Sequence, residues 1–452
     1  MSRALYIFVL TQLAACSASE SDVAPAKSPA KTPAIVAPES ATMPTLPRPW
    51  TDDVLAAETE RYLTNSAFRR RVLEASLTNP KNVYSLTRLS GYGLENRGWE
   101  MLPEWTPTTT SVDNAYVEAL RKGAPVDISA TAKPLWDGTT PTTMSEWVAL
   151  GEKVFYEYPL RSEVFAEHAL RSEELSGRIG LYPDENGVWP GVVAFETLDG
   201  DHEIGITCAL CHVSLEGDTS VAGQARRNLD YGEMRLAYYR DTGAVLAENV
   251  RARMSRWGPG RADITQDDDE DPVAIVDLWG VRDHEYLTQS GTIHQVHPAA
   301  LAIRQETQLL HANQERIRPP RELAWALAMY VYSLTPPAVA SSALTARARH
   351  GKTLFSQHCD HCHRDKNYGG LLVSAESIGT DPVLANGSAR GTGLYRPTPL
   401  TRVAQAAPYL HDGTVESLAT LLDPKRQVPG HRYGTELSLA DRNALVAYME
   451  TL

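Results

Sequence analysis

The chain has 452 residues, of which 42% are apolar and 22% charged, and its formal net charge is -13. This length predicts two or three globular domains, and no long apolar run follows the first sixteen residues. The negative charge excludes a protein whose main partner is nucleic acid, because the chain supplies no basic face for phosphates.

The first fifteen residues have the layout of a secretory signal peptide, with Arg3, an apolar stretch and then small residues. Leu13-Ala14-Ala15-Cys16 resembles the lipobox of bacterial lipoproteins, which implies that Cys16 is lipidated and begins the mature chain. Ordinary cleavage near Ala15 is the alternative. By the same resemblance, Ser17 directs the protein to the outer membrane. We therefore expect an outer-membrane lipoprotein, in the periplasm or at the cell surface, that meets the membrane through its lipid anchor only.

The segment after the signal peptide predicts a tether and then an extension. Residues 16–47 are rich in Ala, Pro, Ser and Lys and have no aromatic residue, which is typical of a disordered tether. Residues 48–143 predict one clear helix, "TDDVLAAETERYLTNSAFRRRVLEASL", that begins at Thr51 and keeps its apolar spacing through Leu73. The rest of this extension is predicted to be irregular and to pack on the domain that follows.

Four of the five cysteines lie in two copies of Cys-x-x-Cys-His, "CALCH" at 208–212 and "CDHCH" at 359–363. This spacing is the attachment pattern of c-type haem, in which two thiols bond the porphyrin and the histidine ligates the iron. A zinc site is the alternative, although two pairs about 150 residues apart would make an unusual zinc ribbon. The predicted attachment and ligand residues of two covalent haems are Cys208, Cys211 and His212, and Cys359, Cys362 and His363.

The helical patterns around these motifs are duplicated. Gly151 and Phe155 stand in the same Gly-x-x-x-Phe relation as Gly351 and Phe355. Residues 326–334 and 444–452 both read Ala-Leu-x-x-Tyr-x-x-x-Leu, and Ser438 with Asp441 predicts a capping pair for the last helix. Strand signals are scarce. We expect a mainly α fold with two tandem cytochrome c-like domains, 144–337 and 338–452, joined through a linker at 335–346.

The sequence from 391 to 452 resembles bacterial di-haem cytochrome c peroxidases. "GTGLYRPTPLTRVAQAAPYLHDGTVESLATLLD" is similar to their C-terminal haem domain, with Arg402 displaced by one place. "PGHRYGTELSLADRNALVAYMETL", "IGITCALCH", "RWGPGRADI" and "VDLWGVR" look closer to the rubber-oxygenase branch of the same superfamily. The resemblance covers about 145–452. It implies an oxidoreductase with two covalently bound haem c groups and a first haem domain enlarged by an N-terminal extension and insertions.

The second haem needs a ligand opposite His363. The peroxidases place a methionine after their His-Asp-Gly, and the matching window "ESLATLLDPKRQ" contains none. Resemblance to the rubber-oxygenase branch points to His431, in the glycine-flanked loop "PGHRYG". His411 is the rival ligand, and a loop histidine with no haem contact is the remaining alternative.

The first haem has no clear second ligand, which favours an open face for peroxide or oxygen. The alternative is that one of the Met and His residues that follow it ligates the iron at rest: Met234, Met254, His284, His294 and His297. The family's acid–base glutamate follows a Trp-Asp-Gly segment, which Gln289 and Ser290 replace here, so Glu306 becomes the catalytic candidate. A solvated helical glutamate is its alternative. Trp257 or Trp279 could serve as a bridge between the haems.

The acidic stretch "TQDDDEDP" at 265–272 is a candidate calcium site, with a solvated loop as the alternative. Together these features predict an exported di-haem oxidoreductase. Its second haem would relay electrons and its first would react with peroxide or dioxygen. An electron-transfer cytochrome without turnover of its own is the alternative. The expected partners are small redox donor or acceptor proteins, together with peroxide, dioxygen or an unknown organic substrate.

Overall fold

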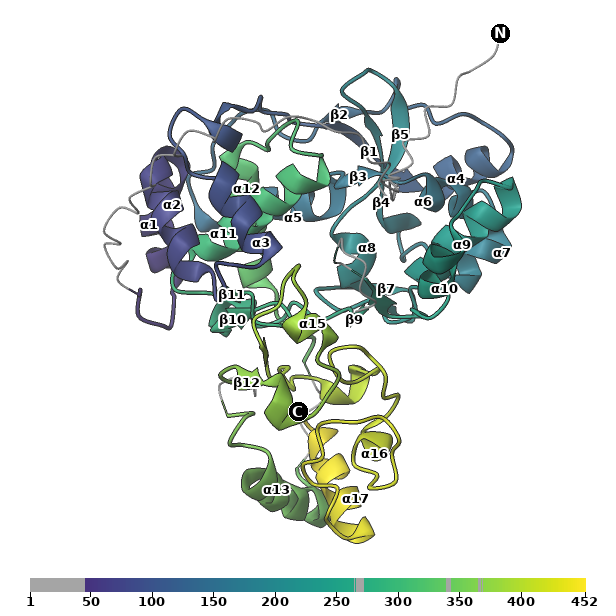
Figure 1. Cartoon of the computed structure of the whole chain (residues 1–452). Coiled ribbons are helices and arrows are strands. Elements are labelled where there is room, and N and C mark those ends of the chain that lie inside the picture. Colours follow the sequence, from purple (N-terminus) through teal and green to yellow (C-terminus); the bar gives the residue numbers. More distant parts are fainter. Residues whose placement is uncertain (1–44, 264, 266–271, 339–342, 365–366, 368) are drawn as a thin grey trace, which may run out of the picture. The chain divides into compact units, whose positions relative to one another are not determined.

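The computed structural model describes residues 45–263, 265, 272–338, 343–364, 367 and 369–452 (Figure 1). The predicted signal peptide, the lipidation site Cys16 and nearly all of the predicted tether lie outside these residues. So does most of the candidate calcium loop, while the predicted linker 335–346 is described only at its two ends. The described part of the chain is mainly helical, as predicted. None of its helices is both long and apolar enough to cross a membrane.

The extension contains two helices where the sequence predicted one. Helix α1 (Asp52–Thr64) begins after its cap Thr51, as expected, and α2 (Ser66–Ser76) follows directly. The prediction of a single helix was wrong because Asn65 is extended and caps α2 by accepting the Phe68 N–H at 2.7 Å. The remaining elements of the extension are α3 (Val83–Gly91), η1 (Gly98–Met101), β1 (Thr108–Asp113), α4 (Asn114–Arg121) and β2 (Lys133–Pro134).

Two pairs of helices cross in the same way, which confirms the duplicated frame. Helix α5 (Met144–Glu157) crosses α12 (Arg321–Ser333), and α13 (Ala346–His358) crosses α17 (Leu439–Met449). A Cβ added at Gly151 would lie 1.9 Å from the carbonyl oxygen of Ala326, and one added at Gly351 would lie 1.9 Å from that of Ala444. Only glycine permits such a close backbone approach at either crossing.

Each crossing also carries the same aromatic pair. Phe155 and Tyr330 have ring centroids 5.2 Å apart, and Phe355 and Tyr448 have theirs 5.4 Å apart. The last helix is capped as predicted, because the Asp441 N–H donates to Ser438 Oγ at 3.2 Å. The equivalent positions therefore agree in sequence, backbone approach and side-chain packing, as in two copies of one unit.

A five-stranded antiparallel sheet, which the sequence did not predict, supports the first motif. Its order is β2-β1-β4-β5-β3, with β3 (Arg161–Ser162), β4 (Val188–Glu196) and β5 (His202–Ile206). Strand β5 leads directly into the short helix α8 (Ala209–His212). Gly191, with φ +95°, lets α8 lie against β4, because a Cβ there would come within 2.1 Å of Leu210 Cα. The sheet thus fixes where the CALCH motif stands.

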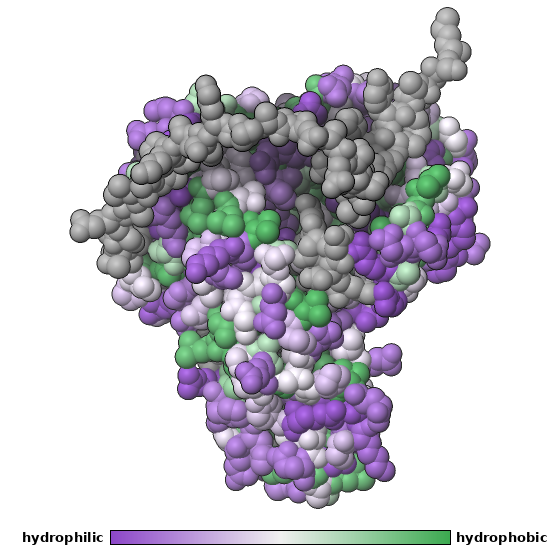
Figure 2. Space-filling view, in the orientation of Figure 1, coloured by the Kyte–Doolittle hydropathy of each residue, from purple (hydrophilic) through white to green (hydrophobic). Residues whose placement is uncertain are grey.

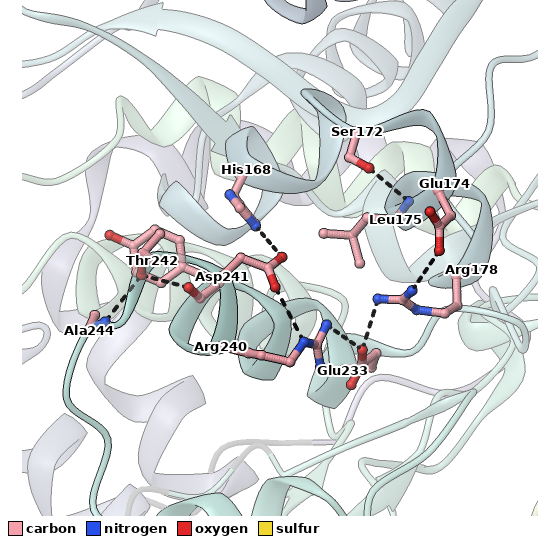
Figure 3. A network of polar contacts seen from close by, with 11 residues as sticks. His168, Ser172, Glu174, Leu175, Arg178, Glu233, Arg240, Asp241, Thr242 and Ala244 are labelled. Carbon is pink, nitrogen blue, oxygen red and sulfur yellow. Dashed lines mark hydrogen bonds and ion pairs between the residues drawn. The ribbon is translucent and has the colours of Figure 1, made fainter.

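Four helices pack beside this sheet: α6 (Val164–Leu170), α7 (Glu173–Arg178), α9 (Tyr231–Thr242) and α10 (Glu248–Met254). Figure 3 shows the surface ion pairs that join three of them. Asp241 accepts from His168 at 3.0 Å and from Arg240 at 3.3 Å, and Glu233 bridges Arg240 and Arg178 at 3.1 Å each. Each exposed ion pair adds little to the free energy of folding. The packing of these helices on the sheet therefore depends mainly on the buried apolar cluster beneath them.

Short elements complete both units. The first has β6 (Val213–Glu216), β7 (Thr219–Ala222), β8 (Arg261–Ala262), β9 (Val273–Ala274), η2 (Val281–Asp283), β10 (Tyr286–Leu287), β11 (Ile293–His294) and α11 (Ala299–Ala312). The second has β12 (Val373–Ser374), α14 (Ala375–Ile378), α15 (Val383–Asn386), β13 (Leu394–Tyr395), η3 (Val403–Gln405) and α16 (Leu418–Leu421). On the face drawn in Figure 2, hydrophobic residues lie in small groups among polar ones.

The extension contacts both units. Helices α1 and α2 share a buried core with α5, α11 and α12. The start of α3 and the loop before it contact the second unit. The backbone N–H groups of Val83 and Tyr84, in the first turn of α3, donate to the carbonyls of Ser388 and Ala389 at 3.0 and 2.9 Å. The Asn79 side chain adds a hydrogen bond to the carbonyl of Gly391 at 2.7 Å. The extension therefore fastens the two units together as well as covering the first.

Candidate functional site

The second motif opens onto a cavity whose walls hold two facing histidines. His363 and His431 have ring centroids 6.3 Å apart. Two axial imidazoles on one iron would stand about 6 Å apart, from metal–nitrogen bonds of about 2 Å and about 1 Å from each nitrogen to its ring centre. The cavity has an empty volume of ≈ 1680 Å³, part of it open to solvent, and Cys359 and Cys362 also line it. The four side chains fit a covalently attached haem.

Apolar residues supply much of the remaining wall of this cavity, among them Phe355, Leu421, Leu422, Leu445 and Met449. Such a lining suits the faces of a porphyrin and limits the access of water to the metal. The cysteines that would attach it are thiols and form no disulfide. Burial raises the pKa of Cys359 to about 12, so the sulfur is a neutral thiol at ordinary pH.

The loop that carries His431 is held in place by a buried arginine. The Arg426 guanidinium, 7% exposed, donates to the carbonyl oxygens of Val428 at 3.0 Å, Gly430 at 2.7 Å and His431 at 3.1 Å. The His431 N–H donates to the Ile378 carbonyl at 2.9 Å. These bonds keep His431 at φ +45°, a left-handed conformation that a non-glycine residue rarely adopts unless its surroundings impose it.

His431 has the chemistry of a ligand. Its Nδ1 is buried without a hydrogen-bond partner among the described residues. Burial and, after it, the neighbouring His363 lower the pKa of His431 to about 4, so the imidazole is neutral. Neutral imidazole is the form that binds a metal. The structure therefore brings together the two histidines that the sequence analysis assigned to this haem.

His411, the rival ligand, is engaged elsewhere in the cavity wall. Its Nε2 lies 3.1 Å from the Tyr395 hydroxyl, and the two rings have centroids 4.3 Å apart. Its carbonyl accepts the Ala274 N–H at 2.8 Å. The His431 ring, by contrast, faces that of His363 with a centroid distance of 6.3 Å. The geometry favours His431.

The first motif stands where α8 meets the sheet. The side chains of Cys208, Cys211 and His212 are half-buried, yet burial is the largest cause of their shifted pKa values. Cys208 packs against the core cluster of α5 and α12, and Cys211 packs against the core cluster beside the sheet. Burial raises the pKa of Cys208 to about 12 and of Cys211 to about 11, and it lowers that of His212 to about 4. Two neutral thiols and one neutral imidazole fit the first haem.

The imidazole of His212 is oriented by one backbone contact. Its Nδ1 lies 3.0 Å from the carbonyl oxygen of Val276. A carbonyl can only accept, so Nδ1 carries the proton and Nε2 keeps its lone pair for a metal. This is the usual outer contact of a metal-binding histidine. Val276 has no feature in the sequence that marks it for this role.

The other residues proposed to ligate the first haem have partners of their own. His294 lies 3.4 Å from Glu285, and His297 Nδ1 accepts the Ala299 N–H at 3.1 Å. His284 Nδ1 lies 3.3 Å from an Arg396 nitrogen, and its Nε2 is buried without a hydrogen-bond partner in the described part of the chain. Met234 and Met254 belong to the core cluster that packs on Cys211. The second ligand of the first haem stays a prediction.

Glu306 is buried, which excludes the alternative of a solvated helical glutamate. It is 1% exposed and accepts from the hydroxyls of Tyr62 at 2.8 Å and Tyr92 at 2.5 Å, and Arg321 Nε lies 3.7 Å away. Burial and Glu306 raise the pKa of both tyrosines well above the usual value. These contacts join the extension to α11 and α12. The catalytic role of Glu306 stays a prediction.

The two tryptophans that could bridge the haems lie in different places. Trp279 lines the cavity of the second motif and donates from Nε1 to the Ala222 carbonyl at 3.0 Å. Trp257 is buried in the core beside the sheet and stacks on Tyr231 at 6.4 Å. A role as a bridge therefore suits Trp279 better.

Sequence reasoning missed Glu163, a buried carboxylate near the first motif. Glu163, 2% exposed, accepts from Arg161 at 2.8 Å and from the Tyr231 hydroxyl at 2.7 Å. Arg161 pairs in the sheet with Ile206, two residues before Cys208. Residues 161–163, "RSE", match no known motif. Only the pairing of β3 with β5 shows that Glu163 lies near the CALCH motif.

No protein-family model and no curated protein matches the chain. Among solved structures, it is similar to a MauG-like protein associated with microbial copper homeostasis, at 16% identity over 43% of this chain and 78% of that one, with a TM-score of 0.30. It is also similar to hydrazine synthase of Kuenenia stuttgartiensis, at 15% identity over 73% of this chain and 98% of that one, with a TM-score of 0.34. Likeness at this level identifies no family, so the function follows from the residues.

Proposed function

We propose that the protein is an exported di-haem c-type cytochrome that acts as an oxidoreductase of the di-haem peroxidase superfamily. In this proposal the site at His363 and His431 relays electrons, and the site at His212 is where peroxide or dioxygen is reduced. The observation that carries it is the pair of facing histidines in the second unit, because two imidazole ligands leave no place for a substrate. The comparable pair is not found for His212 among the described residues.

In this proposal the cysteines attach the two haems, and other residues position their histidine ligands. Cys208, Cys211, Cys359 and Cys362 would each form one thioether bond with a haem vinyl group. The haems, when bound, supply one-electron chemistry at iron. The Val276 carbonyl orients His212, and Arg426 holds the loop that carries His431. Neither imidazole would therefore have to be ordered when the metal binds. The apolar wall of the second cavity limits contact with water and with peroxide.

We propose that the protein is anchored at the outer membrane and exchanges electrons with other proteins there. Cys16 would carry the lipid that holds the protein at the outer membrane, in the periplasm or at the cell surface. Small redox donor or acceptor proteins would exchange electrons with it, and its substrate would be peroxide, dioxygen or an unknown organic compound.

The test compares two histidines of one cavity. Full-length protein should give two c-type haems per chain by pyridine haemochrome, and one after Cys359→Ala with Cys362→Ala. Half-reduced protein should react with peroxide at a high-spin haem. His431→Ala should convert the second haem to a high-spin form, whereas His411→Ala, the matched control, should not. Two low-spin haems inert to peroxide after half-reduction would instead identify an electron carrier, and the absence of covalent haem would refute the proposal altogether.

A further inference from the structure

A short backbone segment, Ala274–Leu278, contacts both candidate haem sites. The carbonyl of Val276 accepts from His212 Nδ1 at 3.0 Å, and the Ala274 N–H donates to the carbonyl of His411 at 2.8 Å. Residues 274–277 also line the cavity that holds His363 and His431. One stretch of chain therefore orients the proximal histidine of the first site and forms part of the wall of the second.

The side chain of Asp277 fixes this segment. Its Oδ1 accepts the Ala225 N–H at 2.8 Å, and its Oδ2 accepts from Arg227 at 2.7 Å. Asp277 and Arg227 side chains are only 18% and 17% exposed, so water screens the pair weakly. Both residues also line the second cavity. The carboxylate thus ties the segment to the loop that follows the CALCH motif.

The neighbouring backbone closes the connection to His212. The Leu278 N–H donates to the Gly223 carbonyl at 2.7 Å, and the Gly223 N–H donates to the His212 carbonyl at 2.8 Å. On the other flank, the Ile275 N–H donates to the Gly260 carbonyl at 2.8 Å. Asp277 follows directly after Val276 in the chain, so its carboxylate contacts help to set the position of the carbonyl that His212 uses.

We propose that Asp277 is a positioning residue shared by the two sites, which sets the hydrogen bond of His212 and the wall of the His363–His431 cavity together. This inference rests on the proposed function. A hydrogen bond from Nδ1 to a carbonyl makes the imidazole a stronger donor, which favours ferric iron and lowers the reduction potential. The position of the wall sets how far water reaches the second site, which is a separate influence on its potential.

The test uses Asp277→Ala and Asp277→Asn in the full-length holoprotein. Alanine removes both contacts, whereas asparagine keeps an oxygen for the Ala225 N–H and loses the charge opposite Arg227. Asp241→Asn is the matched control, because Asp241 is also ion-paired but lies in the surface network of Figure 3. The readouts are the midpoint potentials of both haems, the resonance Raman iron–histidine stretch of the ferrous first haem, and the free energy of unfolding.

Asp277→Ala should raise the midpoint potential of the first haem, lower its iron–histidine stretch and shift the potential of the second haem as well. Asp277→Asn should give smaller shifts of the same sign, and Asp241→Asn none. A loss of stability with both potentials unchanged would overturn the proposal and leave Asp277 as a local brace. A shift at one haem only would also overturn it.

If Asp277→Ala does not fold, Asp277→Asn and Arg227→Gln decide the matter, since Arg227→Gln removes the ion pair and leaves the Ala225 bond. The outcome is separate from that of the proposed function. A chain that holds two haems but ignores peroxide would refute the oxidoreductase, and the potentials of its Asp277 variants would still test the coupling.

Discussion

Gly351→Ala should separate the helices that frame the second unit. The new Cβ would lie 1.9 Å from the Ala444 carbonyl oxygen, 2.5 Å from its carbon and 2.9 Å from Tyr448 Cβ. The first two atoms are backbone and cannot rotate away, so α17 has to move by about 1 Å or more. Overpacking of this kind typically costs about 1–3 kcal/mol and more when backbone must shift. Because backbone must shift here, we expect a cost of about 3 kcal/mol or more. Replacing glycine within a helix returns about 1 kcal/mol, which leaves a net loss of about 2 kcal/mol or more.

The assay is urea denaturation of the full-length protein followed by circular dichroism. Gly151→Ala should cause a similar loss, because its Cβ meets the equivalent carbonyl of Ala326 at the same 1.9 Å. Gly177→Ala in α7 is the matched control. The nearest atom to its added Cβ is 4.0 Å away, so this variant should gain up to about 1 kcal/mol. Wild-type stability of Gly351→Ala would refute the close crossing of α13 and α17.

Three further changes test the site and its surroundings. Arg426→Gln should release the loop and leave buried carbonyls without donors, at a cost of about 1–3 kcal/mol. The absorption spectrum should then show a high-spin second haem, and a spectrum that stays low-spin would contradict the clamp. Glu306→Gln should destabilise the protein by about 1–3 kcal/mol by losing the charge opposite Arg321. Denaturation measures this loss, and a large fall in peroxide turnover at unchanged stability would instead support the catalytic prediction. His297 should make folding acid-sensitive, because burial lowers its pKa from 6.5 to about 4, with Arg61 adding to the effect. Between pH 6.5 and pH 4 the unfolded chain binds a proton at this histidine and the folded chain does not. The free energy of unfolding therefore falls by up to about 3 kcal/mol as the pH drops from above 6.5 towards 4. Glu58, 3.3 Å from Nε2, would reduce this loss. His297→Gln should remove that part of the pH dependence in unfolding measurements at pH 4.5 and 7.5, and an unchanged profile would contradict it.

Much of the helical frame could be predicted because it depends on local patterns. Gly351 and Phe355 share helix α13, and Ser438 caps helix α17, so spacing and capping rules suffice. The single helix predicted through Leu73 failed at Asn65, where a side-chain cap on the backbone competes with helix continuation. The apolar run at 188–196 contains a proline and a glycine and lacks the alternation of a strand, which hid the sheet.

The candidate site divides in the same way. The spacing of the cysteines and histidines predicts the two haem motifs, and the glycines on either side of His431 mark its loop. Val276 contributes only a backbone carbonyl, which every residue possesses, so no sequence pattern could single it out. Arg426 and Asp277 are ordinary charged residues whose roles arise from partners that the fold brings close. Tertiary geometry, and not residue type, makes them specific.

The contacts of the loop before α3 have a consequence for the order of folding. Asn79 and its neighbours bond to residues 388–391, about 310 positions later in the chain. During synthesis residue 79 emerges long before residues 388–391. Their contacts therefore close one of the longest stretches of chain in the protein. The join between the extension and the second unit is therefore completed late in folding.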